Sequence, residues 1–186
     1  MFTHTHRFKR IVAALFFAVG FSLPGHAQQS DLDTLYQDLA EADEASYARI
    51  EQRIIAEWEK SGSPAMDLLL RRGQEALEEG TPDVAAEHFT ALVDHAPDFS
   101  EGYYGRATAY FLLDKIGPAL EDIRMTLELN PRHFEAMRGL ASIMIELERP
   151  EDALELHEMI LEMSPQSVES ETAVEYLRVQ LEGQAL

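Results

Sequence analysis

The sequence predicts an all-α protein, an α-solenoid of three helix–turn–helix units with an N-terminal helical segment and a C-terminal capping helix. Prolines recur at intervals of 34 residues, at Pro97, Pro131 and Pro165, and each follows an apolar helical stretch that its ring cannot continue. The same register aligns two columns of small residues, which are Gly73, Ala107 and Ala141, and Ala85, Ala119 and Ala153. Each period also breaks once near its middle, so each unit is a helix, a turn and a second helix.

The first 27 residues have the features of a secretory signal peptide. Basic residues between Arg7 and Arg10 precede a 13-residue, largely apolar run over 11–23, and the small residues that a signal peptidase reads end at Ala27. The run is too short to cross a hydrocarbon core of about 30 Å. We therefore expect cleavage after Ala27, a periplasmic or secreted protein, and no membrane association after cleavage; an uncleaved anchor is the alternative.

Residues 28–63 are expected to form an N-terminal helical segment. Two stretches place apolar residues on one face at helical spacing, first Leu32, Leu35, Tyr36 and Leu39, then Tyr47, Ile50, Ile54 and Trp58. The second stripe has two interpretations: it packs against the first repeat as core, or it forms a helix that binds a partner or makes contacts in an oligomer. Gly62 and Pro64 end the segment, because glycine closes helices and proline suits the first helical position.

The repeat region is expected over 64–167, with units at about 66–99, 100–133 and 134–167. Pro82, Pro118 and Pro150 lie just inside the second helices, where the missing N–H costs little. Residues 168–186 are expected to form the capping helix, with inward apolar residues and an outward polar face. The inward residues are Val174, Leu177 and Leu181.

These columns resemble those of the tetratricopeptide repeat (TPR) family, whose unit is a 34-residue helix–turn–helix. The resemblance covers about 66–167 and implies a right-handed superhelix in which the small residues let paired helices approach closely. Phe89 and Ile123 match the bulky column of the second helix, whereas the third unit has His157 there. Arg72 and Arg106 stand where the family usually carries leucine.

Composition excludes several classes of function. The chain has 34 acidic and 15 basic residues and a formal charge of −19; residues 1–27 hold three basic residues and no acid, so the remainder carries −22. Nucleic acid is therefore not an expected partner, since phosphate binding needs a basic surface. The chain has no cysteine, which excludes disulfides, a thiolate nucleophile and zinc–thiolate sites.

No pattern of residues indicates catalysis. His88 and His95 are about two helical turns apart, too far to share one metal ion, and His157 lacks the second histidine of a His-Glu-x-x-His motif. There is no Gly-x-Ser-x-Gly sequence and no glycine-rich phosphate loop. We therefore expect a protein that is not an enzyme, with no metal site and no cofactor.

The resemblance implies instead a concave groove, lined by the first helix of each unit, that binds an extended or helical peptide segment. The positions that match are Leu70, Gln74 and Leu77, then Tyr104, Thr108 and Phe111, then Arg138, Ser142 and Ile145. The edges of the groove are acidic, with Glu101 and Glu135 among them, and Arg138 is the one cation at these positions. A cationic or amphipathic segment is thus favoured over an acidic chaperone tail.

Two functions follow, from different classes. The first is a non-catalytic adaptor that holds a partner protein in the envelope of a Gram-negative bacterium. The second is a self-assembling structural component, in which 28–60 provides the contacts of a homo-oligomer.

Overall fold

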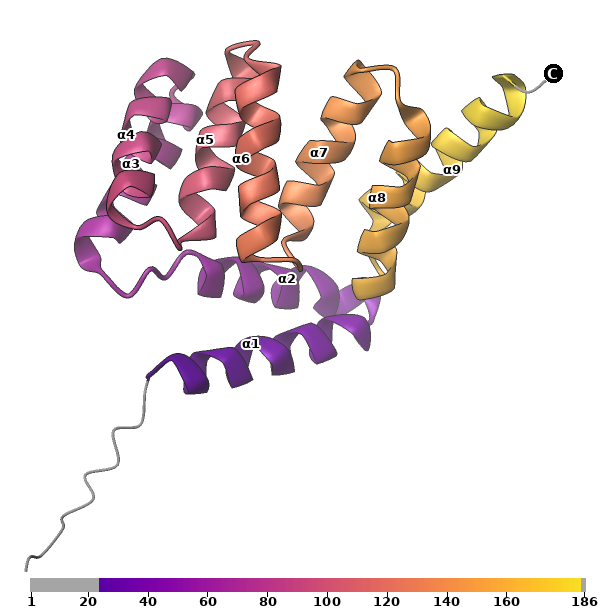
Figure 1. Cartoon of the computed structure of the whole chain (residues 1–186). Helices are drawn as coiled ribbons and strands as arrows, with labels where there is room; N and C mark the ends of the chain where they lie inside the picture. The colour runs from indigo at the N-terminus through magenta and orange to yellow at the C-terminus, as the bar shows by residue number, and fades with distance from the viewer. Residues whose placement is uncertain (1–23, 185–186) are drawn as a thin grey trace, which may run out of the picture.

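The computed structural model describes residues 24–184, and the regular secondary structure of this part of the chain consists of nine α-helices (Figure 1). They are α1 (Pro24–Ala40), α2 (Glu44–Trp58), α3 (Pro64–Glu78), α4 (Pro82–His95), α5 (Ser100–Leu112), α6 (Ile116–Leu129), α7 (Phe134–Glu146), α8 (Pro150–Met163) and α9 (Val168–Gln184). Most of the expected signal peptide lies outside the described residues, and the expected cleavage point after Ala27 falls within α1. No helix in 24–184 is long and apolar enough to span a membrane.

Helices α3 to α9 form the expected α-solenoid. The pairs α3–α4, α5–α6 and α7–α8 stand side by side, and α9 follows them at the C-terminal end (Figure 1). Pro64, Pro82 and Pro150 occupy the first turns of α3, α4 and α8, where no backbone N–H is needed. Pro97, Pro131 and Pro165 lie in the turns between units.

The ring of Phe89 packs between units one and two and requires glycine on both sides. A Cβ atom added at Gly73 would lie 2.5 Å from the ring, and one added at Gly105 would lie 2.4 Å from it. Phe89 itself is fully buried. The small residue at 73 was expected from the repeat, whereas the need for Gly105 was not, because the first unit has Arg71 at the equivalent position.

Arg106, which departs from the leucine usual in the family, makes a bidentate ion pair across unit two. Its Nε and Nη2 atoms donate to the two carboxylate oxygens of Asp122 at 2.7 and 2.8 Å. Asp122 is buried, so the guanidinium satisfies a carboxylate that burial would otherwise penalise. A largely buried charge pair thus joins α5 to α6.

Helices α1 and α2 run across the ends of the repeat helices rather than continuing the stack (Figure 1). Their apolar stripes form one buried cluster with Phe134 and Met137 of α7 and Ile160 of α8. The expectation of core packing is met, but the expected partner, the first repeat, is wrong: the buried apolar side chains that receive the stripe belong to the third unit, and Leu127 of α6 also packs against them. The breaks at 41–43 and 59–63 let the two helices fold back beneath the array.

Helix α9 packs at the end of the array as expected, but its outward face differs from the expectation. Val174 and Leu177 are buried and Leu181 is half-buried against the third unit. The outward face is not uniformly polar, however, because Tyr176 and Val179 are 66% and 70% exposed. The spacing that predicted the inward residues could not show that the opposite face also carries apolar side chains.

Candidate functional site

The nine residues predicted to line the groove fall into three rows on α3, α5 and α7, because the 34-residue period repeats each position on successive first helices. We define the near row as Leu70, Tyr104 and Arg138, the middle row as Gln74, Thr108 and Ser142, and the far row as Leu77, Phe111 and Ile145. The near row lies toward the start of α3, α5 and α7, where α2 crosses the array, and the far row lies toward their ends.

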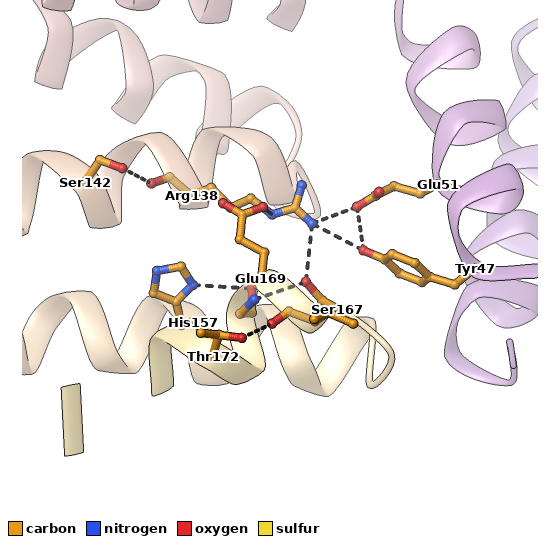
Figure 2. Close-up of polar contacts among 10 residues, drawn as sticks. Tyr47, Glu51, Arg138, Ser142, His157, Ser167, Glu169 and Thr172 are labelled. Atoms are coloured by element: carbon orange, nitrogen blue, oxygen red, sulfur yellow. Dashed lines mark hydrogen bonds and ion pairs between the residues drawn. The ribbon is translucent and has the colours of Figure 1, made fainter. Parts of the chain in front are cut away.

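Arg138 of the near row already has partners within the chain (Figure 2). Its Nη2 atom donates to Glu51 Oε1 at 2.7 Å and to the Tyr47 hydroxyl at 3.3 Å, and its Nε lies 3.4 Å from Glu169 Oε2. Burial alone would lower the pKa of Arg138, but the hydrogen bond and charge of Glu51 outweigh it and raise that pKa. Arg138 therefore ties α7 to α2 and to the start of α9.

The other near-row residues are also covered. Leu70 is 4% exposed. Tyr104 packs against the imidazole of His133, with ring centroids 4.7 Å apart, and burial raises the pKa of its hydroxyl. In the middle row, Gln74 Nε2 donates to Glu59 Oε1 at 2.7 Å. The chain's own α2 and the residue that follows it thus occupy the near side of the groove.

His133 joins the second unit, the third unit and α2. Its Nδ1 atom accepts from the backbone N–H of Ala136 at 3.2 Å and so caps α7, which leaves Nε2 to carry the proton. Nε2 lies 2.9 Å from Glu101 Oε1 and donates to it, and the indole of Trp58 stacks on the ring at 4.3 Å between centroids. The sequence offered one signal for this role, the position of His133 directly before a helix.

The far side of the groove is open. Ile145 is 49% exposed, and Leu77 and Phe111 are half-buried. Thr108 and Ser142 of the middle row donate to backbone carbonyl oxygens one turn earlier in their own helices, at 3.0 and 3.1 Å.

Two cavities lie beside these rows. The first, which we call the acidic chamber, has a volume of about 350 Å³ and lies between α2, α3, α5 and the start of α7. It is lined by Gln52, Ile55, Glu59, Leu70, Gln74, Leu77, Phe89, Glu101, Tyr104, Gly105, Thr108 and Glu135. The second, the apolar slot, has a volume of about 170 Å³ and is lined by Tyr104, Ala107, Thr108, Phe111, Ile123, Gly139, Ser142 and Ile143.

The family model named "Tetratricopeptide repeat" matches residues 70–116 and 115–168, which together make up more than half of the chain. The protein belongs to the tetratricopeptide repeat family. A TPR repeat-containing protein of Rhizobium etli is 32% identical over 110 residues, which are 59% of this TPR chain and 54% of that relative. The chain therefore spans about half the length of that curated relative.

Solved TPR structures have the same fold. The first TPR domain of Spaghetti (RPAP3), bound to the HSP90 peptide SRMEEVD, superposes with a TM-score of 0.59 at 25% identity, over 62% of this chain and 92% of that one. The crystal structure of MamA gives a TM-score of 0.59 at 19% identity, over 81% and 84% of the two chains. The TPR fold is typical of protein–protein interaction modules.

Among residues 24–184, no group of three or more His, Asp and Glu side chains is placed to hold a metal ion. The sequence predicted these groove positions and an acidic edge at Glu101 and Glu135. It did not identify Gln52, Ile55 and Glu59, which reach the chamber from α2 and its end, because nothing in the repeat pattern places the N-terminal segment.

Proposed function

We propose that this protein is a non-catalytic adaptor that binds a partner segment on the far side of its concave groove. The observation that carries the proposal is the division of the groove: α2 covers the near row, while the far row and the apolar slot stay accessible. Phe111 and Ile145 are the central contacts, since apolar and aromatic side chains in desolvated pockets dominate the energy of most interfaces.

The partner segment is cationic or amphipathic. The peptide on the Spaghetti domain, SRMEEVD, carries three acidic residues. This chain has carboxylates at Glu59, Glu101 and Glu135 along the groove, and its one groove arginine is held by Glu51. An acidic tail would meet repulsion here, and a basic segment would meet attraction.

Self-assembly through the N-terminal helices is the less favoured alternative. The apolar stripes of α1 and α2, as far as their side chains are described, are used within the chain against the third unit. A homo-oligomer would need another surface, and a formal charge of −19 opposes the approach of a second copy.

The adaptor works outside the cytoplasm, in the bacterial envelope. This part of the proposal depends on the basic start, the apolar run and the small residues before position 28. Intact mass of the protein recovered from its host tests it. We expect a chain beginning at Gln28, and a chain that retains residues 1–27 would contradict export with cleavage.

Photo-crosslinking in the host cell tests the groove directly. A photoreactive amino acid at position 145 lies in the far row, and one at Val84, an exposed position on α4, is the matched control away from the groove. We expect a defined adduct from 145, absent from 84, and lost when Phe111→Ala is added. The same adduct from both positions, or only self-adducts, would contradict the proposal.

A further inference from the structure

We propose that the acidic chamber receives a lysine or arginine side chain of the bound partner segment. The inference rests on the proposed function, which it makes more specific by assigning the chemistry of one side chain and the cavity that takes it.

The chamber has the size and lining of a binding pocket. Its volume of about 350 Å³ is within the range of roughly 300–1,000 Å³ that is usual for ligand sites. Ile55, Leu70 and Tyr104 supply apolar surface for an aliphatic stem.

Charge decides what the chamber binds. Glu59, Glu101 and Glu135 line it, and no lysine or arginine is among the lining residues. Glu59 accepts a hydrogen bond from Gln74, and Glu101 accepts one from His133. Within the described residues, Glu135 makes no hydrogen bond and no ion pair. Burial, together with the charge of Glu101, raises the pKa of Glu135 and outweighs the opposing effects of His133 and Arg138. Arg138, whose charge also acts on Glu135, is engaged by Glu51.

The chamber and the apolar slot adjoin each other. Tyr104 and Thr108 line both, so one peptide segment can place an apolar side chain in the slot and a basic side chain in the chamber. An amphipathic basic segment satisfies both sites, whereas a purely apolar one leaves Glu135 without a partner.

Three fluorescein-labelled 12-residue peptides test the assignment on the full chain. One alternates leucine and lysine, the second replaces each lysine by Nε-acetyl-lysine, which keeps the length and removes the charge, and the third alternates leucine and glutamate. Fluorescence anisotropy measures the Kd of each peptide for the wild type and for Glu135→Gln, Glu175→Gln and Phe111→Ala. Glu175 is exposed on α9, so its variant changes the net charge equally but lies outside the chamber.

We expect the lysine peptide to bind most tightly and Glu135→Gln to weaken it by about ten-fold or more, the effect of losing one charge-assisted contact. Glu175→Gln should change that Kd by less than about two-fold, the small effect of an exposed charge. Equal losses in both variants would overturn the inference, because they would indicate general charge attraction only.

The same titrations separate this inference from the proposed function. If the acetylated peptide binds as tightly as the lysine peptide and Phe111→Ala weakens both, the groove binds partners but the chamber does not select a cation. If no peptide binds, both claims fail. Circular dichroism of Glu135→Gln should match the wild type, since its side chain has no hydrogen bond to lose.

Discussion

The indole ring of Trp58, at the end of α2, stacks on the imidazole of His133, which caps α7, with centroids 4.3 Å apart and planes 30° from parallel. The same indole donates from Nε1 to the Tyr36 hydroxyl at 3.1 Å, which links α1 to the contact. A segment outside the repeats is thereby fixed against the start of the third unit.

Replacing Trp58 by alanine should lower the free energy of unfolding by about 3–5 kcal/mol, the usual cost of emptying a buried aromatic site. Chemical denaturation followed by circular dichroism measures it. Trp58→Phe, which keeps an aromatic ring, should lower the free energy of unfolding by markedly less. A loss below about 1 kcal/mol for the alanine variant would mean that α2 does not depend on this contact.

The ion pair of Arg138 with Glu51 should also show strong coupling. Their side chains are only 17% and 15% exposed, so removing one partner leaves an uncompensated charge. We expect Arg138→Met alone to cost about 3–5 kcal/mol. In a double-mutant cycle with Glu51→Leu, the coupling should lie in the upper part of the range of about 0.5–3 kcal/mol. Additive losses would contradict the contact.

Gly105→Ala should destabilise the fold by about 1–3 kcal/mol, because the new methyl group would overlap the ring of Phe89. Gly139→Ala is the matched control: it also lies inside a helix, and its Cβ would be 4.0 Å from the nearest atom, Ile123 Cδ1. The control should be neutral or slightly stabilising, since alanine favours helix. Equal melting temperatures for the two variants would contradict the close packing of Phe89.

Glu135→Gln should raise the melting temperature at pH 7. The folded pKa of Glu135 is raised above its unfolded value of 4.5, so its contribution to stability is present below that value and is lost as pH rises through the folded pKa. The difference between variant and wild type should therefore disappear near pH 4. A difference that is independent of pH would contradict the burial of an unpaired carboxylate.

Much of the fold was predictable because the same residue types recur at equivalent packing positions in three successive units. Pro97 and its equivalents mark the unit boundaries, and Gly73 and its equivalents mark close helix contacts. One unit alone would not have shown which of its proline, glycine and alanine positions are structurally required. Gly105 and Arg106 were not predictable in this way. Gly105 contacts Phe89 of the first unit, and Arg106 pairs with Asp122 of its own unit. The other units have no phenylalanine or aspartate at the equivalent positions.

The candidate site was predictable only in outline. The near, middle and far rows follow from the period, but their accessibility depends on where α2 lies. The apolar stripe that includes Ile54 and Trp58 has to be buried against another surface. The sequence does not indicate which surface, because any apolar face of the array could bury it. The contacts that select the third unit, with His133 and Arg138, join residues too distant in sequence for local patterns to connect.

The central claim is that a partner occupies the open far row while α2 stays in place. The chain has no cysteine and one tryptophan, so Ile145→Cys and Val84→Cys can be labelled with maleimide while Trp58 emission reports on α2. With the partner captured at position 145, purified and added in excess, we predict slowed labelling at 145, unchanged labelling at 84 and unchanged Trp58 emission. Equal protection at both positions, or a shift in Trp58 emission on binding, would contradict the account.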